Sequence, residues 1–224
     1  MKSLVPMVFL TALFCVNSAA MLAFDAVTEP AGVYYLDFTG GVASIPQAYP
    51  IPTQATLQVP PFRPLGSDVD ATERIVKLVL ENVRRDFSRW PGIEIRTGES
   101  HDLSGGNVVL VGGWAQEAGN LGIASTVDAG DRSSDDKAVV YSGNVVDTLT
   151  GGLRFVPAEE DIAQAVANVV SHEIGHLLGF SHVAGGFLEI MSPGLSTEAA
   201  AMDQMFCRYH QSYVDRRFLW CDTR

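Results

Sequence analysis

Hydrophobic residues recur every third or fourth position in two long segments of the chain, which is the spacing of an amphipathic helix. The first segment, residues 68–90, ends at Pro91-Gly92. Its apolar positions are Ile75, Val76, Val79, Leu80, Val83 and Phe87. The second begins at Pro157, and the acidic residues 159–161 are favourable in its first turn. Its apolar positions are Ile162, Val166, Val169, Val170, Ile174 and Leu177.

Shorter segments rich in β-branched and aromatic residues predict strands. They are residues 33–38, 93–96, 107–111, 121–127 and 137–142. Residues 44–67 are rich in proline and lack a clear period, so we expect an ordered surface loop there. Near the C-terminus, residues 197–213 are expected to form one more helix. Strands and helices are therefore mixed along the chain, without internal repeats.

The strongest chemical signal is the sequence HEIGHLLGFSH, which begins at His172. On a helix, His172 and His176 lie one turn apart on the same face, and Glu173 projects beside them. Gly179 can adopt the left-handed conformation that ends a helix, so that His182 can approach as a third ligand. Three histidine ligands predict one catalytic Zn²⁺ with an open position for water. Glu173 would take the proton of that water.

This motif resembles the HExxHxxGxxH consensus of the metzincin zinc endopeptidases. Those enzymes also have a methionine-containing turn under the metal, and here Met191 would supply it, followed by Ser192-Pro193-Gly194. The Ile-Met-x-Pro form is most similar to the matrixin branch and to related bacterial secreted enzymes. The resemblance extends over residues 33–195, although only the zinc motif and the methionine turn are specific.

The resemblance implies an α+β fold of the metzincin type. A twisted mixed sheet with two long helices would form the N-terminal lobe, residues 21–182. Residues 183–224 would form a short, mainly helical C-terminal lobe that carries the methionine turn.

The resemblance also implies a zinc-dependent endopeptidase in which Glu173 is the catalytic base. An extended peptide or protein substrate would pair with an edge strand of the sheet. The substrate-binding residues would be Gly122, Ile123, Ala124 and Ser125 on that strand, and Pro193, Gly194 and Leu195 beside it. Tyr209 and Tyr213 are weaker candidates for stabilising the oxyanion. The alternative is a zinc-bearing secreted binding or toxin-like module with little or no proteolysis.

Departures from the matrixin pattern bear on other metal ions. Matrixins hold a structural zinc through histidines in the strands, but Ser125 stands where one would be expected, and no histidine lies between His101 and His172. A second zinc ion is therefore not expected. We expect His101 and His210 to be surface or structural residues. An acidic segment could hold Ca²⁺ through its oxygens or form a solvated loop. Its residues are Asp128, Asp131, Asp135 and Asp136.

Residues 1–20 have the pattern of a secretory signal peptide: Lys2, an apolar run over residues 4–16, and the small residues Ser18-Ala19-Ala20. We therefore expect export to the periplasm or the medium, and a mature catalytic domain of residues 21–224 that is a monomer. The alternative is an uncleaved membrane anchor over residues 3–24.

The net charge of −11 and the sequence pI near 4.7 argue against a nucleic-acid partner. Cys207 and Cys221 remain after the signal segment. In an exported chain an even number of cysteines predicts a disulfide bond, here Cys207–Cys221. Two free thiols are the alternative.

Overall fold

The structure is a computed structural model of the 224-residue chain. It describes residues 32–47, 53–66, 68–99, 106–115, 120–128, 135–151, 156–183 and 188–218. The expected signal peptide, His101, Asp131 and Cys221 lie outside these residues. None of the helices in the described ranges has the length and hydropathy needed to cross a membrane.

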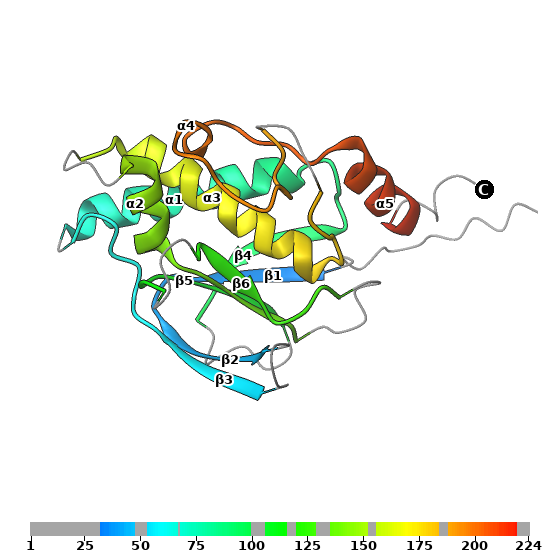
Figure 1. Cartoon of the computed structure of the whole chain (residues 1–224), viewed down its shortest axis with the longest axis horizontal. Coiled ribbons are helices and arrows are strands. Elements are labelled where there is room, and N and C mark those ends of the chain that lie inside the picture. The colour runs from blue at the N-terminus through cyan, green and yellow to red at the C-terminus, as the bar shows by residue number, and fades with distance from the viewer. Residues whose placement is uncertain are drawn as a thin grey trace, which may run out of the picture.

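A five-stranded mixed sheet forms the centre of the molecule, with the strand order β4-β1-β5-β7-β6 (Figure 1). Its strands are β1 (Gly32–Asp37), β4 (Ile93–Thr97), β5 (Asn107–Val111), β6 (Gly122–Ala124) and β7 (Lys137–Val140). Four strands are parallel, and β6 runs antiparallel to β7 at one edge. Strand β5 is buried along its whole length, as a central parallel strand covered on both faces must be.

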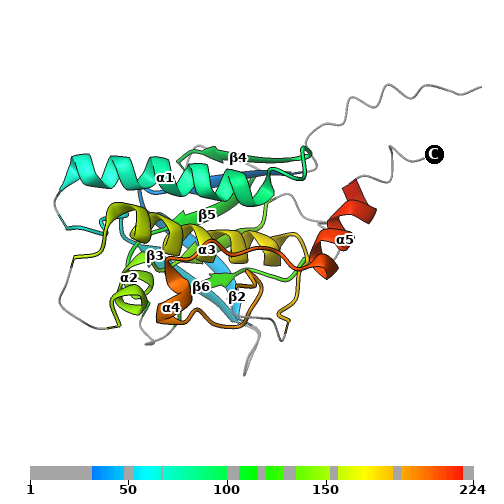
Figure 2. The ribbon, with the colours of Figure 1, turned by 90° about the horizontal axis from the view of Figure 1, so that it is seen from above.

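Two long helices, α1 (Val69–Phe87) and α3 (Glu159–Leu177), pack side by side against one face of the sheet (Figures 1 and 2). Their apolar stripes and the strands enclose the main hydrophobic core. The Asp68 side chain caps α1 by accepting a hydrogen bond from the Ala71 amide at 2.9 Å. The two helices expected from the apolar spacing are thus confirmed.

The opposite face of the sheet is covered by a hairpin of β2 (Gly41–Gln47) and β3 (Thr53–Val59) (Figure 1). The prediction of a surface loop over residues 44–67 was therefore wrong for this segment. Ala43, Ile45 and Val59 lie in a second hydrophobic cluster with residues of β5 and β7. Pro46 interrupts the alternation of apolar and polar residues from which a strand would be predicted. Proline is tolerated in a two-stranded ribbon because one edge of each strand is unpaired.

Two further helix boundaries differ from the prediction. Residues 137–142 were expected to be one strand, but β7 ends at Val140 and helix α2 (Ser142–Thr150) follows. No side chain caps the start of α2, so the sequence lacks the usual signal for a helix N-terminus. The helix expected over residues 197–213 is instead two helices, α4 (Thr197–Ala200) and α5 (Arg208–Phe218).

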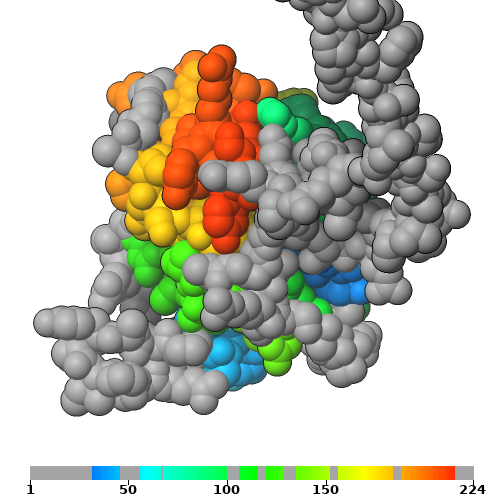
Figure 3. Space-filling model, turned by 90° about the vertical axis from the view of Figure 1, so that its right-hand side faces the viewer, coloured from blue at the N-terminus to red at the C-terminus, as the bar shows by residue number. Residues whose placement is uncertain are grey.

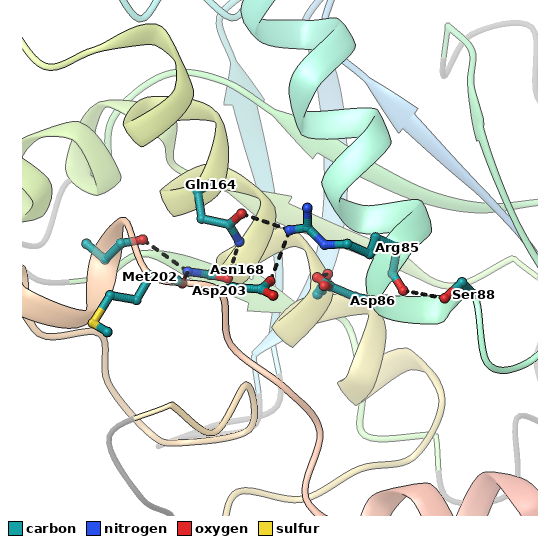
Figure 4. A network of polar contacts seen from close by, with 9 residues as sticks. Arg85, Asp86, Ser88, Gln164, Asn168, Met202 and Asp203 are labelled. Carbon is teal, nitrogen blue, oxygen red and sulfur yellow. Dashed lines mark hydrogen bonds and ion pairs between the residues drawn. The ribbon is translucent and has the colours of Figure 1, made fainter.

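A polar network, buried at Gln164 and Asn168 and exposed at Arg85 and Asp203, holds the segment between α4 and α5 against the long helices (Figure 4). Arg85 donates hydrogen bonds to Gln164 and to Asp203, both at 3.0 Å. Gln164 donates to the Asn168 side-chain oxygen at 2.9 Å, and Asn168 donates to the Met202 carbonyl at 2.9 Å. Asn168 also donates to the Ala200 carbonyl at 3.0 Å, so α3 binds the chain at the point where α4 ends.

Candidate metal centre and active site

Three histidine side chains converge at the C-terminal end of α3. His172 and His176 project from the last two turns of the helix, and His182 follows the turn that ends it. That turn depends on Gly179, whose φ of +92° lies in the left-handed region. The Nε2 atoms of the three imidazoles lie 3.1 Å from one another in every pair. Figure 3 shows this end of the molecule, where α5 (red) lies beside the end of α3 (yellow).

Backbone carbonyl groups orient two of the three rings. His172 Nδ1–H donates to the Ile190 carbonyl at 2.6 Å, and His176 Nδ1–H donates to the Phe180 carbonyl at 2.8 Å. A neutral imidazole with its proton on Nδ1 has only a lone pair on Nε2. The short Nε2–Nε2 distances therefore bring lone pairs to a shared point, which is the arrangement that a cation requires.

Burial favours the neutral form of these histidines. It lowers the pKa of His172 to about 4, and the neighbouring His176 and His182 rings lower it further, while the bond to the Ile190 carbonyl opposes the change. Burial also lowers the pKa of His176. Both rings are therefore uncharged near neutral pH, and the uncharged imidazole is the form that binds metal ions.

The donor set fits zinc. A tetrahedral ion about 2.0–2.1 Å from each nitrogen places the nitrogen atoms about 3.3 Å apart, close to the observed 3.1 Å. The bonds from Nδ1 to carbonyl oxygens are the outer contacts that normally fix a metal-binding histidine. His172, His176 and His182 form one of two groups of potential metal ligands among the described residues.

Glu173 lies beside the histidines and is buried, with 3% of its surface exposed. Its Oε2 atom has no hydrogen-bond partner among the residues that the structure describes. Burial raises the pKa of Glu173 to about 8. A buried carboxyl oxygen without a protein partner is a suitable acceptor for a proton from water or substrate.

The edge strand β6 touches Glu173 directly. A Cβ atom on Gly122 would lie 2.8 Å from Glu173 Cδ and 2.9 Å from its Cγ. Only glycine at this position leaves the carboxyl group where it is. The edge strand thus positions Glu173 in addition to forming the border of the site.

Met191 is fully buried and packs against α3, the helix that carries His172 and His176. It lies within a tight turn, in which the Ser192 amide donates to the Glu189 carbonyl at 3.1 Å. Its sulfur packs against Gly175, where an added Cβ would collide with the methionine Sδ and lie 3.2 Å from its Cε. The same turn supplies the Ile190 carbonyl that orients His172, so it supports the metal ligands directly.

A pocket of about 380 Å³ opens beside the histidines and Glu173. Four of the seven predicted substrate-binding residues line it: Gly122, Pro193, Gly194 and Leu195. Ile123, Ala124 and Ser125 do not line it; Ile123 packs toward the hairpin, and the Ser125 hydroxyl accepts a hydrogen bond from the Lys137 amide. Thr148, Asn168 and Gln204 add polar groups that sequence reasoning had not assigned to the site.

The other candidates lie elsewhere. Tyr209 is exposed, and Tyr213 packs against Phe180, so neither lines the pocket. Asp128, Asp135 and Asp136 form no group of potential metal ligands among the described residues, and calcium has no support. His210 is buried in the core and is not a surface residue.

The predicted disulfide also lacks support. Cys207 forms no disulfide with any residue that the structure describes, and Cys221 lies outside those residues.

Two kinds of group in the site were not predicted from the sequence. They are backbone carbonyls, and glycines whose lack of a side chain permits close contacts. The carbonyls of Phe180 and Ile190 orient the rings, but a carbonyl has no sequence signature. Gly122 and Gly175 permit close contacts with Glu173 and Met191. A glycine inside a helix is unfavourable, so Gly175 within α3 was a signal of close packing that could have been used.

No protein-family model matches the chain, and no curated protein matches it significantly. Among solved structures, the chain is similar to archaemetzincin from Methanopyrus kandleri, with 15% identity, a TM-score of 0.45, and coverage of 87% of this chain and 98% of that one. It is also similar to archaemetzincin from Archaeoglobus fulgidus complexed with malonate, with 15% identity, a TM-score of 0.42, and coverage of 81% and 98%. These comparisons give no support to the matrixin branch, and the likeness is too distant to assign a function.

Proposed function

We propose that this chain is a zinc-dependent endopeptidase. The observation that carries the proposal is the convergence of three imidazole nitrogens beside a buried glutamate, at the mouth of a pocket that borders an edge strand. A site that only held zinc for structural reasons would have no use for an additional buried carboxyl group without a protein partner.

His172, His176 and His182 would hold the ion through Nε2. When bound, zinc would act as a Lewis acid toward a peptide carbonyl and would acidify a water molecule at the position that the three histidines leave open. The carbonyls of Ile190 and Phe180 keep the imidazole protons on Nδ1, so that the ligand nitrogens need not be deprotonated.

Glu173 would act as the general base and then as the general acid. It accepts a proton from the attacking water and delivers it to the nitrogen of the leaving amine. Burial raises the pKa of Glu173 and so makes its carboxylate a stronger base, while the charge of a bound Zn²⁺ would favour the ionised form that accepts the proton.

The substrate would bind as an extended strand. Strand β6 pairs with β7 on one side and forms the edge of the sheet on the other, so that a peptide backbone can add to it. The side chain next to the scissile bond would enter the pocket, whose apolar wall includes Val169, Ile190 and Leu195.

The pocket supports cleavage within a chain, not at its ends. None of the described residues that line it is lysine or arginine, so it offers no cation for a C-terminal carboxylate. Its acidic lining residue among those described is Glu173, which the reaction itself requires. An extended binding site without charged partners for a terminus favours an endopeptidase.

The proposal is tested by the substitution Glu173→Gln. We expect cleavage of a quenched-fluorescence peptide library to fall by a factor of about 10²–10⁴, the usual contribution of a general base. Zinc bound per chain should be unchanged, because Glu173 is not a ligand. Glu160→Gln, an exposed substitution in the first turn of the same helix, is the matched control and should leave both values at the wild-type level.

Full activity of the Glu173→Gln variant would rule out the proposed base. If the wild-type chain binds zinc but cleaves no peptide in the library, the proteolytic function is wrong. In that event, partners captured equally well by wild type and by Glu173→Gln would favour a zinc-bearing binding module.

A further inference from the structure

A second pocket, of about 390 Å³, lies between the chain that follows β3 and the start of α2 (Figure 1). Its volume is within the usual range of ligand sites, about 300–1,000 Å³. It shares no lining residue with the pocket beside the histidines, and none of its residues has a role in the proposed reaction. Three of its lining residues are prolines from the segment after β3: Pro60, Pro61 and Pro64.

Trp114 is the largest side chain in this pocket, and 61% of its surface is exposed. Its indole ring packs against Gly143, where an added Cβ would collide with the ring carbons. Gly113, with a φ of +63°, is equally close to Pro60, since an added Cβ would lie 2.5 Å from the proline Cδ. The two glycines therefore hold the indole and the proline in place. A tryptophan supported in this way, with an open surface, is a preformed platform for an apolar side chain.

The polar groups of this pocket favour a negative ligand. Arg63 is its charged residue among those described, and the guanidinium has no partner among them. Ser142 is buried, with 3% of its surface exposed, yet its hydroxyl makes no hydrogen bond with any described residue. Ser142 also begins α2, whose first turn has no side-chain cap. A guanidinium, an unpaired hydroxyl and the positive end of a helix together suit a carboxylate.

The second pocket lies close to the histidine pocket, on the other side of α2. Thr148 of α2 lines the histidine pocket, whereas Val146 lines the second pocket. Asn144 connects the two walls: it donates to the Asn120 carbonyl at 2.8 Å and accepts from the Ala115 amide at 3.2 Å. Asn120 lines the histidine pocket, and Ala115 directly follows Trp114 in the sequence.

A peptide bound along β6 has a direct path to this pocket. Beyond Gly122 such a peptide passes Asn120, which Asn144 joins to the segment that carries Trp114. An extended chain advances about 3.3 Å per residue, so a residue a few positions from the scissile bond can reach the indole.

We propose that this pocket is a remote substrate subsite, in which Trp114 holds an apolar side chain and Arg63 holds an acidic residue beside it. The inference rests on the proposed peptidase function. The chain has a net charge of −11, so an acidic segment of a substrate is repelled by the protein as a whole. A single unpaired cation beside an apolar platform therefore selects where such a segment binds.

The test uses quenched-fluorescence peptides that share one cleaved core and differ in a short tail. The tail contains Leu-Asp, Leu-Lys or Gly-Asp, placed two to six residues from the cleaved bond on each side in turn. The measured quantity is the ratio of kcat/KM between two tails, taken within each protein. Arg63→Glu and Trp114→Ala are the test variants. Lys77→Glu is the matched control, because it makes the same charge change on the exposed face of α1.

We expect the wild type to prefer Leu-Asp over Leu-Lys by a factor of about 10 at one tail position, the effect of a charge-assisted hydrogen bond. Arg63→Glu should reverse this preference, and Lys77→Glu should keep it. Trp114→Ala should remove the preference for Leu-Asp over Gly-Asp. Equal cleavage of all three tails at every position, or a preference that Arg63→Glu leaves unchanged, would overturn the subsite.

A binding measurement separates the subsite from the proposed function. The chain has three tryptophans, and the indole N–H resonance of Trp114 is assigned by its loss in Trp114→Phe. A capped Leu-Asp tail peptide without the cleaved core should shift this resonance more than the Leu-Lys peptide does. A chain that cleaves no peptide but shows this shift would refute the proposed function and retain the pocket as a peptide site. Peptide cleavage with neither the tail preference nor the shift would refute the subsite and leave the peptidase function standing.

Discussion

Replacement of Gly122 by alanine tests how the edge strand positions Glu173. The new methyl carbon would lie 2.8 Å from Glu173 Cδ and 2.9 Å from Cγ, with Oε1 also within collision distance. Carbon atoms in contact are normally about 3.5–4.0 Å apart. The carboxyl group must therefore move away from β6 by roughly 1 Å.

The expected loss of activity follows from this displacement. A shift of about 1 Å in a catalytic group reduces the rate by a factor of about 10². The stability of the fold should change less, because the carboxyl end of a side chain can move at a cost of about 1–3 kcal/mol. Gly122→Ala should therefore lower kcat much more than it lowers the free energy of unfolding.

The assay is kcat on a quenched-fluorescence peptide, with zinc per chain and urea unfolding measured on the same sample. Gly66→Ala is the control, since Gly66 lies in an exposed turn away from the site and has no atom within 4 Å of an added Cβ. Its φ of +72° costs about 1 kcal/mol of stability on substitution, without any contact to the site. Wild-type kcat in folded, zinc-loaded Gly122→Ala would refute the contact between β6 and Glu173 as a determinant of activity.

Three further predictions concern stability, each measured by urea unfolding. Burial raises the pKa of Asp86 to about 7, so between about pH 4 and pH 7 the unfolded chain binds fewer protons than the folded chain. Asp86 should therefore contribute a fall in stability of up to about 4 kcal/mol across this window, and Asp86→Asn should remove that contribution; an equal slope in both proteins would contradict this. Asn168→Ala should destabilise the chain by about 2–4 kcal/mol, because it leaves two backbone carbonyls without their donor; a change below about 0.5 kcal/mol would refute the role of the network. Gly175→Ala should cost about 1–3 kcal/mol through its collision with Met191, and Met191→Ala about 2–5 kcal/mol. The double variant should lose at least about 1 kcal/mol less unfolding free energy than the two single variants lose in sum. Additive losses would show that the two residues do not compete for space.

The sequence predicted the long helices and the histidine ligands because each has a local physical basis. The apolar positions of α1 and α3 recur with the helical period, so burial of one face was visible without any tertiary information. The spacing of His172 and His176 by one turn, with Gly179 behind them, similarly depends on helix geometry alone.

The elements that were missed depend on contacts between distant segments. The β2–β3 hairpin is stabilised by packing on β5 and β7, and Pro46 concealed its alternation. The helix expected over residues 197–213 is interrupted where Asn168 binds backbone carbonyls from another part of the chain.

The most direct test of the account is the activity of the chain as a function of bound zinc. Peptide cleavage and zinc per chain would be measured in the same samples during removal of zinc by a chelator and its stepwise return. The account predicts that cleavage is lost with the zinc of the histidine site, returns when that site is refilled, and is absent from His176→Ala at every zinc concentration. Cleavage that persists in the zinc-free chain or in His176→Ala would contradict the central claim.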